Sequence, residues 1–431
     1  MRRVLCLIAT VLITLGLCQP AQAQSAVTSF VVTVSDIRVD YSFGEGITFT
    51  ARIQSASVIQ EALISFQAQG DPNTRIALIQ IGADGMTSYQ YPISAGLLRP
   101  FTPALRGFTR IFFWYCLTLQ SGEVYTSPQF YFDYVDNRFP WQSLEDATLR
   151  LHWYAGDITF GQAAFDMARI GLQAVNSLIP TTASEPIDIY IYATPTDVQN
   201  ALSLGGQSWL AGQASPDLGV VLVSISPGAE QTTAMQRQIP HELAHVLLYR
   251  HTGPAYNQLP TWLREGIASL VELYPNADYV QVLGIASQTQ TLLPIPDLCG
   301  PFPQDASRAL LAYAESASFT RYLHDTYGTS GLLTLTQAYT DGLDCEQGAA
   351  RAFGSSLSQI DQQWRQAALG ENVGGIAFQN LLPYLVVLAV ILAFPAWGFW
   401  SARKRRTSHD ASRSTCTCLH MRRYRCASAG K

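Results

Sequence analysis

The residues best suited to chemistry in this 431-residue chain stand in the run His-Glu-Leu-Ala-His at 241–245. Residues four apart lie on one face of a helix, so His241 and His245 can offer two imidazole nitrogens to one metal ion. Glu242 projects from the same helix and can reach a water on that metal. A catalytic zinc ion takes three protein ligands and one water. Glu265, in the run Trp-Leu-Arg-Glu-Gly at 262–266, is the best candidate for the third ligand. The spacing predicts metal-assisted hydrolysis with Zn²⁺ as the cofactor.

The helix that carries the histidines has a proline directly before them. Proline is tolerated in the first turn of a helix and is disruptive in its interior. Pro240 therefore predicts that this helix begins near Ile239 or Pro240 and runs over about 240–250. The competing interpretation is an amphipathic helix whose histidines pack in a core. It is less favoured because Glu265 follows in a second helical pattern.

Thr261 is a plausible N-cap for that second helix. Glu272 comes seven residues after Glu265, which is nearly two turns, so both carboxylates would share one face. Two interpretations of Glu272 remain open. It either accepts a hydrogen bond from a ligand histidine, as metal sites require, or it is a partly solvated glutamate.

These motifs resemble those of the gluzincin branch of zinc metallopeptidases. The closest likeness is to peptidase MA-like domains, which are similar to the catalytic domains of M1-type aminopeptidases. The matching stretches lie within roughly 140–370 and are 241–245, Pro-Thr-Trp-Leu-Arg-Glu-Gly-Ile-Ala at 260–268 and, more weakly, 313–323 with Tyr327-Gly328. The resemblance implies that His241, His245 and Glu265 bind zinc and that Glu242 is the general base.

By the same resemblance, a downstream tyrosine donates to the oxyanion, and Tyr313 is the candidate here. The M1 aminopeptidases also carry a Gly-x-Met-Glu-Asn strand whose glutamate holds the free amine of the substrate. The comparable stretch, 211–219, contains no glutamate. The sequence therefore favours an endopeptidase or oligopeptidase over an aminopeptidase.

Residues 24–137 carry a β pattern with turn signals between short alternating runs, which is typical of a β-sandwich. The expected strands are 30–34, 47–53, 61–66, 75–79, 110–119, 123–126 and 129–134. No constellation here looks catalytic, so the expected role is a spacer or a substrate-docking face. The aromatic residues at 112–115 and 130–134 are interpreted as core packing, not as a sugar platform.

Residues 138–370 alternate between strand and helix patterns, which gives an α+β fold class overall. The resemblance implies that a zincin-like α/β domain with a helical C-terminal subdomain follows the sandwich. The expected strands are 149–154, 187–192 and 219–225, and the further expected helices are 160–178, 196–204, 306–327, 331–340, 345–353 and 357–369. By the gluzincin resemblance, 219–225 is the edge strand above the metal. An extended substrate can add itself to such an edge.

The two ends of the chain predict export and anchoring. Residues 1–23 combine early arginines, an apolar run and a small-x-small site, which is typical of a signal peptide. After a linker at 371–380, the uncharged run within 381–401 predicts a transmembrane helix, with a buried core helix as the competing interpretation. The basic tail, 402–431, is then cytoplasmic. We expect a single-pass cell-membrane protein with its ectodomain outside.

Charge and cysteines limit the partners. Residues 24–402 contain 16 basic and 31 acidic residues and no lysine, which argues against nucleic acid and anionic lipid as partners of the ectodomain. Three cysteines are expected outside, so one disulfide is the most that a chain can form. Cys299 with Cys345 is favoured because both lie in loops beyond the catalytic motifs, and Cys116 would remain a buried thiol.

The predicted function is a membrane-anchored extracellular zinc peptidase that acts on a peptide or protein substrate. The alternative is a non-catalytic adhesion or receptor ectodomain on a peptidase-like scaffold. Glu242 favours the first, because a retired site has no physical need for a general base. The other histidines considered, which lack ligand spacing, are interpreted as structural or surface residues: His152, His251 and His324.

Overall fold

A computed structural model describes residues 32–93, 105–181, 185–202, 212–371, 381–395 and 397–398. The chain divides into two compact units, Met1–Arg138 and Phe139–Lys431. The expected signal peptide, most of the expected linker and the expected tail lie outside the described residues. No helix in the described ranges is both long enough and apolar enough to cross a bilayer. The transmembrane helix expected at 381–401 lies only partly within the described residues and stays a prediction.

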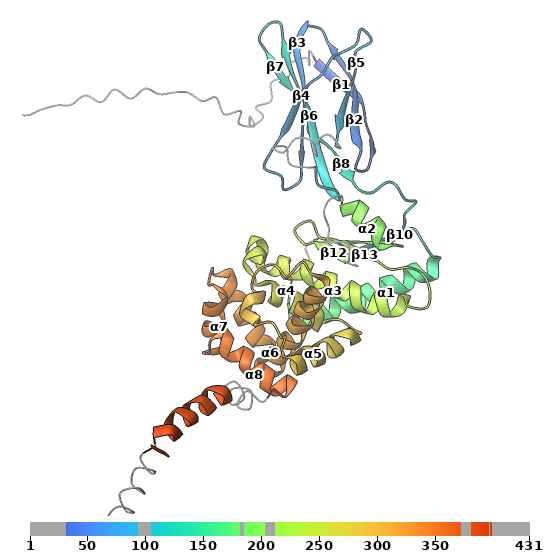
Figure 1. The fold of residues 1–431 in the computed structure, drawn as a ribbon. Helices are drawn as coiled ribbons and strands as arrows, with labels where there is room; N and C mark the ends of the chain where they lie inside the picture. Colours follow the sequence, from blue (N-terminus) through green and yellow to red (C-terminus); the bar gives the residue numbers. More distant parts are fainter. Residues whose placement is uncertain are drawn as a thin grey trace, which may run out of the picture. The chain divides into compact units, whose positions relative to one another are not determined.

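The first unit is a sandwich of two antiparallel sheets (Figure 1). One sheet has the order β1-β2-β5, and the other has the order β4-β3-β6-β7 with β8 paired to β6. The strands are β1 (Val32–Ser42), β2 (Gly46–Ser55), β3 (Ile59–Ala68), β4 (Arg75–Leu78), β5 (Met86–Pro92), β6 (Thr109–Leu119), β7 (Val124–Thr126) and β8 (Phe130–Tyr134). Phe49 of β2 contacts Phe66 of β3 and Phe113 of β6 with ring centroids 5.2 Å apart. The two sheets therefore share one aromatic core.

The aromatic run on β6 is divided between the two faces of its sheet. Phe113 and Tyr115 are buried, whereas Phe112 and Trp114 are only half-buried, because successive side chains of a strand point to opposite faces. The expectation that all of these rings are core residues was therefore only half right. Cys116, a free thiol, lies on the outer face and is half-buried, not buried as expected. Strand β5 was missed because its side chains are mostly polar and only one is buried.

The second unit contains a five-stranded sheet with the order β12-β13-β11-β10-β9. Its strands are β9 (Gln142–Glu145), β10 (Leu149–Trp153), β11 (Ile187–Tyr192), β12 (Gly212–Ser215) and β13 (Val220–Ser224). The three central strands are parallel, and the two edge strands are antiparallel to their neighbours. The expectation that 219–225 forms the edge was wrong. Every residue of β13 is buried, as a continuous apolar run in a strand covered on both faces requires.

Helices α1 (Ile158–Leu178) and α3 (Gln231–Thr252) cover one face of this sheet, and α2 (Pro195–Leu202) lies on the other (Figure 1). The expected start of the metal-binding helix was wrong, because α3 begins at Gln231 and Pro240 lies in its interior. Helices α1 and α3 approach closely at this point. A Cβ atom added at Gly171 would lie 3.0 Å from Pro240 Cγ, so glycine permits the contact.

The rest of the second unit is helical. Its elements are η2 (Gly253–Gln258), α4 (Thr261–Leu270), α5 (Ala277–Thr289), η3 (Ile295–Leu298), α6 (Ala306–Thr340), α7 (Cys345–Phe353) and α8 (Leu357–Leu369). Helix α5 was not predicted. The two helices expected at 306–327 and 331–340 form the single element α6, which is interrupted at Gly328, where φ is 71°. The favoured disulfide is confirmed: Cys299 at the end of η3 is bonded to Cys345 at the start of α7.

A buried polar cluster holds the segment between α5 and η3. Glu315 of α6 accepts a hydrogen bond from the N–H of Leu293 at 2.9 Å. Arg365 of α8 donates to the Leu293 carbonyl at 2.8 Å and to Asp361 Oδ1 at 2.9 Å. Glu315 is 0% exposed, and its Oε2 atom has no hydrogen-bond partner among the described residues. Burial raises the pKa of Glu315 to about 8, so this carboxyl is protonated near neutral pH in the folded protein.

We expect Glu315→Gln to remove part of the pH dependence of folding stability. The pKa of this carboxyl rises from its ordinary value of 4.5 to about 8 on folding. The folded state therefore binds the extra proton between those values, and the free energy of unfolding falls as pH increases by at most about 1.4 kcal/mol per pH unit. Glutamine still accepts from Leu293 but cannot ionise. Urea unfolding between about pH 5 and pH 8 should show the slope in the wild type and its reduction in the variant.

Glu145→Gln serves as the control, because it removes an exposed carboxylate from the same unit. This variant should keep the wild-type slope. An identical slope in Glu315→Gln and the wild type would show that Glu315 is already ionised in the folded protein.

Candidate metal centre

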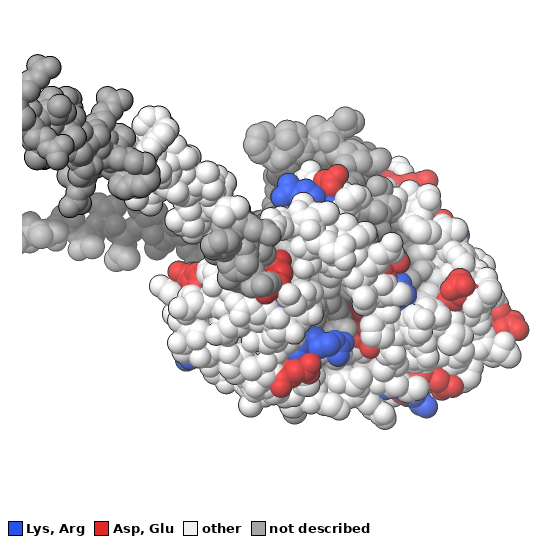
Figure 2. Space-filling model, turned by 60° about the horizontal axis from the view of Figure 1, so that its bottom comes forward, with Lys and Arg blue, Asp and Glu red and all other residues white. Residues whose placement is uncertain are grey.

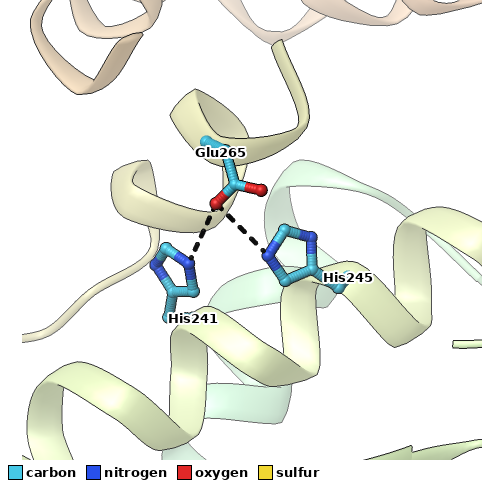
Figure 3. A group of neighbouring side chains, drawn as sticks. All are labelled: His241, His245 and Glu265. Atoms are coloured by element: carbon cyan, nitrogen blue, oxygen red, sulfur yellow. Dashed lines mark ion pairs between the residues drawn. The ribbon is translucent and has the colours of Figure 1, made fainter. Parts of the chain in front are cut away.

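Three side chains from two helices converge at one point. His241 and His245 lie one turn apart on α3, and Glu265 of α4 points between them (Figure 3). Glu265 Oε2 is 3.5 Å from His241 Nε2 and 3.7 Å from His245 Nε2, and one ligand atom from each residue lies within 4.8 Å of the others. Donors bound to zinc at about 2.1 Å in a tetrahedron are about 3.4 Å apart. The three side chains therefore fit a zinc ion with one position left for another ligand.

Each histidine has a second partner on its other ring nitrogen. Glu272 Oε1 lies 2.9 Å from His241 Nδ1, and the Tyr256 hydroxyl lies 3.0 Å from His245 Nδ1. With both Nδ1 atoms engaged, the two Nε2 atoms are left to face the metal position. Of the two interpretations of Glu272, the structure shows the contact with a histidine. Tyr256, in η2, was not found from the sequence, because a single tyrosine between two helices carries no spacing signal.

Pro240 explains how Glu272 is brought to His241. Proline has no N–H group, so the carbonyl of Gln236, four residues earlier, has no helical partner. The N–H of Leu273 donates to that carbonyl at 3.0 Å. This bond holds the neighbouring Glu272 against α3. Glu272 lies beyond the end of α4, not on its face as expected, and the tether at Leu273 replaces the helix in positioning it.

Helix α4, which carries Glu265, is fixed at two points. Gly266 packs so closely on α6 that a Cβ atom there would lie 2.6 Å from the Ser316 carbonyl oxygen, so the approach requires glycine. Thr261 is the first helical residue and not the N-cap as expected, and its N–H donates to the Cys299 carbonyl at 3.1 Å. Because Cys299 belongs to the disulfide, the start of α4 is connected to α7.

Glu242 lies beside the three candidate ligands without belonging to them. It is 8% exposed, and its carboxylate accepts a hydrogen bond from the backbone N–H of Ala214 on β12. Burial raises the pKa of Glu242, and the two histidines oppose that shift. The edge strand next to this carboxylate is therefore β12 and not the expected β13.

The centre concentrates negative charge. Burial alone would lower the pKa of His241, but hydrogen bonds with Glu265 and Glu272 and the charge of Glu242 raise it well above its usual range. Burial would raise the pKa of Glu265, but the two histidines lower it strongly, so this carboxylate is ionised. Positive charge between these carboxylates stabilises them, and a divalent cation would supply it.

A cleft of about 620 Å³ opens over the centre. Its lining residues are Ala214, Pro216, Arg237, Gln238, His241, Glu242, His245, Tyr256, Arg264, Glu265, Glu272, Asn276, Tyr279, Ala306, Leu310 and Tyr313. This volume is typical of sites that hold a small ligand or a short stretch of peptide. The histidines interpreted as structural, His152, His251 and His324, do not line it.

Tyr313, the expected oxyanion donor, lies in the wall of this cleft. Its ring packs edge-on against Phe302 with centroids 5.0 Å apart. Burial and then the charges of Glu265 and Glu242 raise the pKa of Tyr313. Its hydroxyl therefore keeps its proton at neutral pH and can donate a hydrogen bond.

The residues of the metal centre lie within a stretch of the chain that matches a known protein family. Residues 167–370 match the family described as the Peptidase MA superfamily, which supports a zincin-like fold and a zinc peptidase-like scaffold for the second unit. No curated protein matches the chain.

Several solved structures are similar to parts of the chain. An M1 zinc metallopeptidase from Deinococcus radiodurans is 12% identical, with 78% of this chain and 94% of that chain covered and a TM-score of 0.34. OgpA from Akkermansia muciniphila is 15% identical over 26% of this chain and 30% of that chain, with a TM-score of 0.19. A structure titled "Myokine structure" is 12% identical over 24% of this chain and 95% of that chain, also at 0.19. These scores are too low to carry an argument about function.

We expect Pro240→Ala to weaken zinc binding about tenfold to a hundredfold, although Pro240 offers no ligand atom. Alanine restores an N–H for the Gln236 carbonyl, so Leu273 loses its acceptor and Glu272 loses its tether. Competition with a chromogenic chelator measures the affinity. The metal-free variant should unfold at no lower temperature than the wild type, because alanine is the better helix former.

The matched control is Pro254→Ala in the first turn of η2. A proline there leaves no helical carbonyl without its partner, so zinc affinity should stay at the wild-type value. Equal affinities for Pro240→Ala and the wild type would show that the Leu273 tether does not position Glu272.

Proposed function

We propose that this protein is a zinc-dependent peptidase of the gluzincin type that cleaves peptides or proteins within the chain. The observation that supports it is the convergence of His241, His245 and Glu265 beside Glu242, a carboxylate that is left out of the ligand set. A zinc ion held by these three residues would lower the pKa of a water molecule and polarise the scissile carbonyl.

In this proposal Glu242 is the general base. Its carboxylate takes a proton from the attacking water and later passes it to the leaving amine. The hydrogen bond from the Ala214 N–H keeps the side chain turned toward the cleft. Burial suits Glu242 to the role, because a raised pKa moves the carboxyl toward the working pH of a proton carrier.

The substrate lies along β12 in this proposal. An edge strand can pair with an extended peptide through main-chain hydrogen bonds, and Ala214 of β12 lines the cleft. Residues 212–219 contain no glutamate to hold a free amine, which favours cleavage within the chain. Tyr313 would donate its hydroxyl proton to the oxygen on which negative charge develops.

The location of the protein is likewise a proposal that rests on the sequence alone. The signal-like residues 1–23, the uncharged run that follows 380 and the basic residues after 402 favour a single-pass protein with the cleft outside the cell. The acidic composition of 24–402 suits an exposed ectodomain.

We expect Glu242→Gln to retain zinc and to lose peptidase activity by about a hundredfold to ten-thousandfold, because glutamine cannot accept the proton. His241→Ala should lose both zinc and activity. Metal analysis and cleavage of a peptide library, followed by mass spectrometry, measure the two effects. Near-stoichiometric zinc without cleavage by the wild type would instead favour the non-catalytic adhesion or receptor ectodomain.

We expect Tyr313→Phe to lower kcat by about a hundredfold to a thousandfold with little change in KM or in zinc content. The hydroxyl acts only on charge that develops in the transition state, so its loss should leave ground-state binding intact. Tyr322→Phe, on the same helix but away from the cleft lining, is the control. A kcat of Tyr313→Phe equal to that of the control would remove Tyr313 from the mechanism.

A further inference from the structure

Arg237, in the cleft wall, belongs to no ion pair among the described residues. Arg237 lies on α3 one turn before His241 and lines the cleft. Its Nε atom is buried, and no hydrogen-bond partner for it occurs among the described residues. Other arginines of this unit show what is lacking: Arg150 forms a two-point pair with Asp188, and Arg365 pairs with Asp361. A buried guanidinium N–H without a partner is costly.

The neighbours of Arg237 do not neutralise it. Glu272 is engaged by His241 and lies outside ion-pair distance of the guanidinium, since the ion pairs of the described residues do not include this one. The charge of Arg237 acts on the hydroxyl of Tyr279. Burial raises the pKa of Tyr279, so this side chain stays a neutral phenol and cannot balance the arginine. The positive charge of Arg237 is therefore available to a ligand in the cleft.

A second polar atom nearby is also without a partner. Gln238, the next residue on α3, lines the same cleft, and its Oε1 atom is buried with no hydrogen-bond partner in the described ranges. The wall beside the metal centre thus presents a donor with positive charge and an amide acceptor. A peptide offers the complementary pair, which is a carboxylate oxygen and a main-chain N–H.

We propose that Arg237 is a specificity-determining residue that binds a carboxylate of the peptide substrate. This inference rests on the peptidase function proposed above. Four helical residues separate Arg237 from His241 by about 6 Å along the axis, and an extended peptide advances about 3.3 Å per residue. The carboxylate therefore lies within about one to three residues of the scissile bond, as a C-terminal carboxylate or as an Asp or Glu side chain.

Arginine suits this role for a geometric reason. Its planar guanidinium can pair with both oxygens of a carboxylate, and such pairs are strongest where water is excluded. The face of the molecule drawn in Figure 2 carries scattered acidic and basic side chains. The half-buried Arg237 in the cleft wall offers such a pairing to a carboxylate of the substrate.

The test uses probes that bind without being cleaved. Peptide hydroxamates chelate an active-site zinc ion, so their anchoring does not depend on knowing the natural substrate. One set ends in a carboxylate or a carboxamide after one, two or three residues. A second set is amidated and carries Asp or Asn at the same places. Isothermal titration of the full-length, zinc-loaded protein gives each affinity.

We expect the wild type to prefer the carboxylate member of a pair by about tenfold to a hundredfold at one spacing. The set that shows the preference identifies the source of the carboxylate. Arg237→Gln should remove the preference and leave the amide probes unchanged, and Arg237→Lys should keep part of it because lysine is a point charge. Arg321→Gln, which removes an exposed charge on α6, should keep all of it.

The outcomes separate the two proposals. Hydroxamates that bind with no carboxylate preference, or with a preference that survives in Arg237→Gln, would overturn the role of Arg237 and leave the zinc peptidase intact. A protein that binds neither zinc nor any hydroxamate would overturn the proposed function, and the carboxylate site would fall with it.

Discussion

The second unit holds a cluster of buried carboxylates around two histidines that a divalent cation would neutralise. Glu242 and Glu265 are close to both imidazoles, Glu272 contacts that of His241, and all three carboxylates are largely shielded from water. Carboxylates cannot share so small a volume unless positive charge lies between them. The histidines can supply it as protons, but the spacing of their Nε2 atoms about Glu265 Oε2 suits a divalent ion better. Helices α3 and α4 therefore hold these side chains where a divalent cation would bind.

The two helices that carry the candidate ligands contain poor helix formers next to those ligands. A proline inside a helix costs about 3 kcal/mol and a glycine about 1 kcal/mol, yet Pro240 precedes one ligand and Gly266 follows another. Each loss is offset by a tertiary contact that a better helix former would prevent. Pro240 leaves a carbonyl for Leu273, and Gly266 lets α4 approach α6. Pro240 and Gly266 thus lower the intrinsic stability of their helices, and the contacts that they permit position the side chains of the metal centre.

The sequence predicted what repeats at fixed spacing and missed what depends on tertiary contact. His241 and His245 follow from the helical period, and Glu265 follows from a motif nearby. Tyr256 could not be found, because its contact with His245 depends on the path of a loop. Likewise the position of β12 as the edge strand could not be read from a four-residue segment. Pro240 was misjudged because a rule about isolated helices ignores the partner that its freed carbonyl finds.

Two parts of the cleft lining differ in how many of their polar atoms have hydrogen-bond partners. Around the candidate metal ligands most polar atoms have hydrogen-bond partners. Glu272 and Tyr256 contact the Nδ1 atoms of the two histidines, and the Ala214 N–H donates to Glu242. These hydrogen bonds hold the side chains in the positions that catalysis needs before a substrate binds. One turn earlier on α3, Arg237 Nε and Gln238 Oε1 are buried without partners among the described residues. Both residues line the cleft, so these atoms lie beside the volume that a substrate would enter. In the proposed peptidase, helix α3 would thus carry the catalytic residues and, one turn toward its start, polar atoms that a substrate would complete.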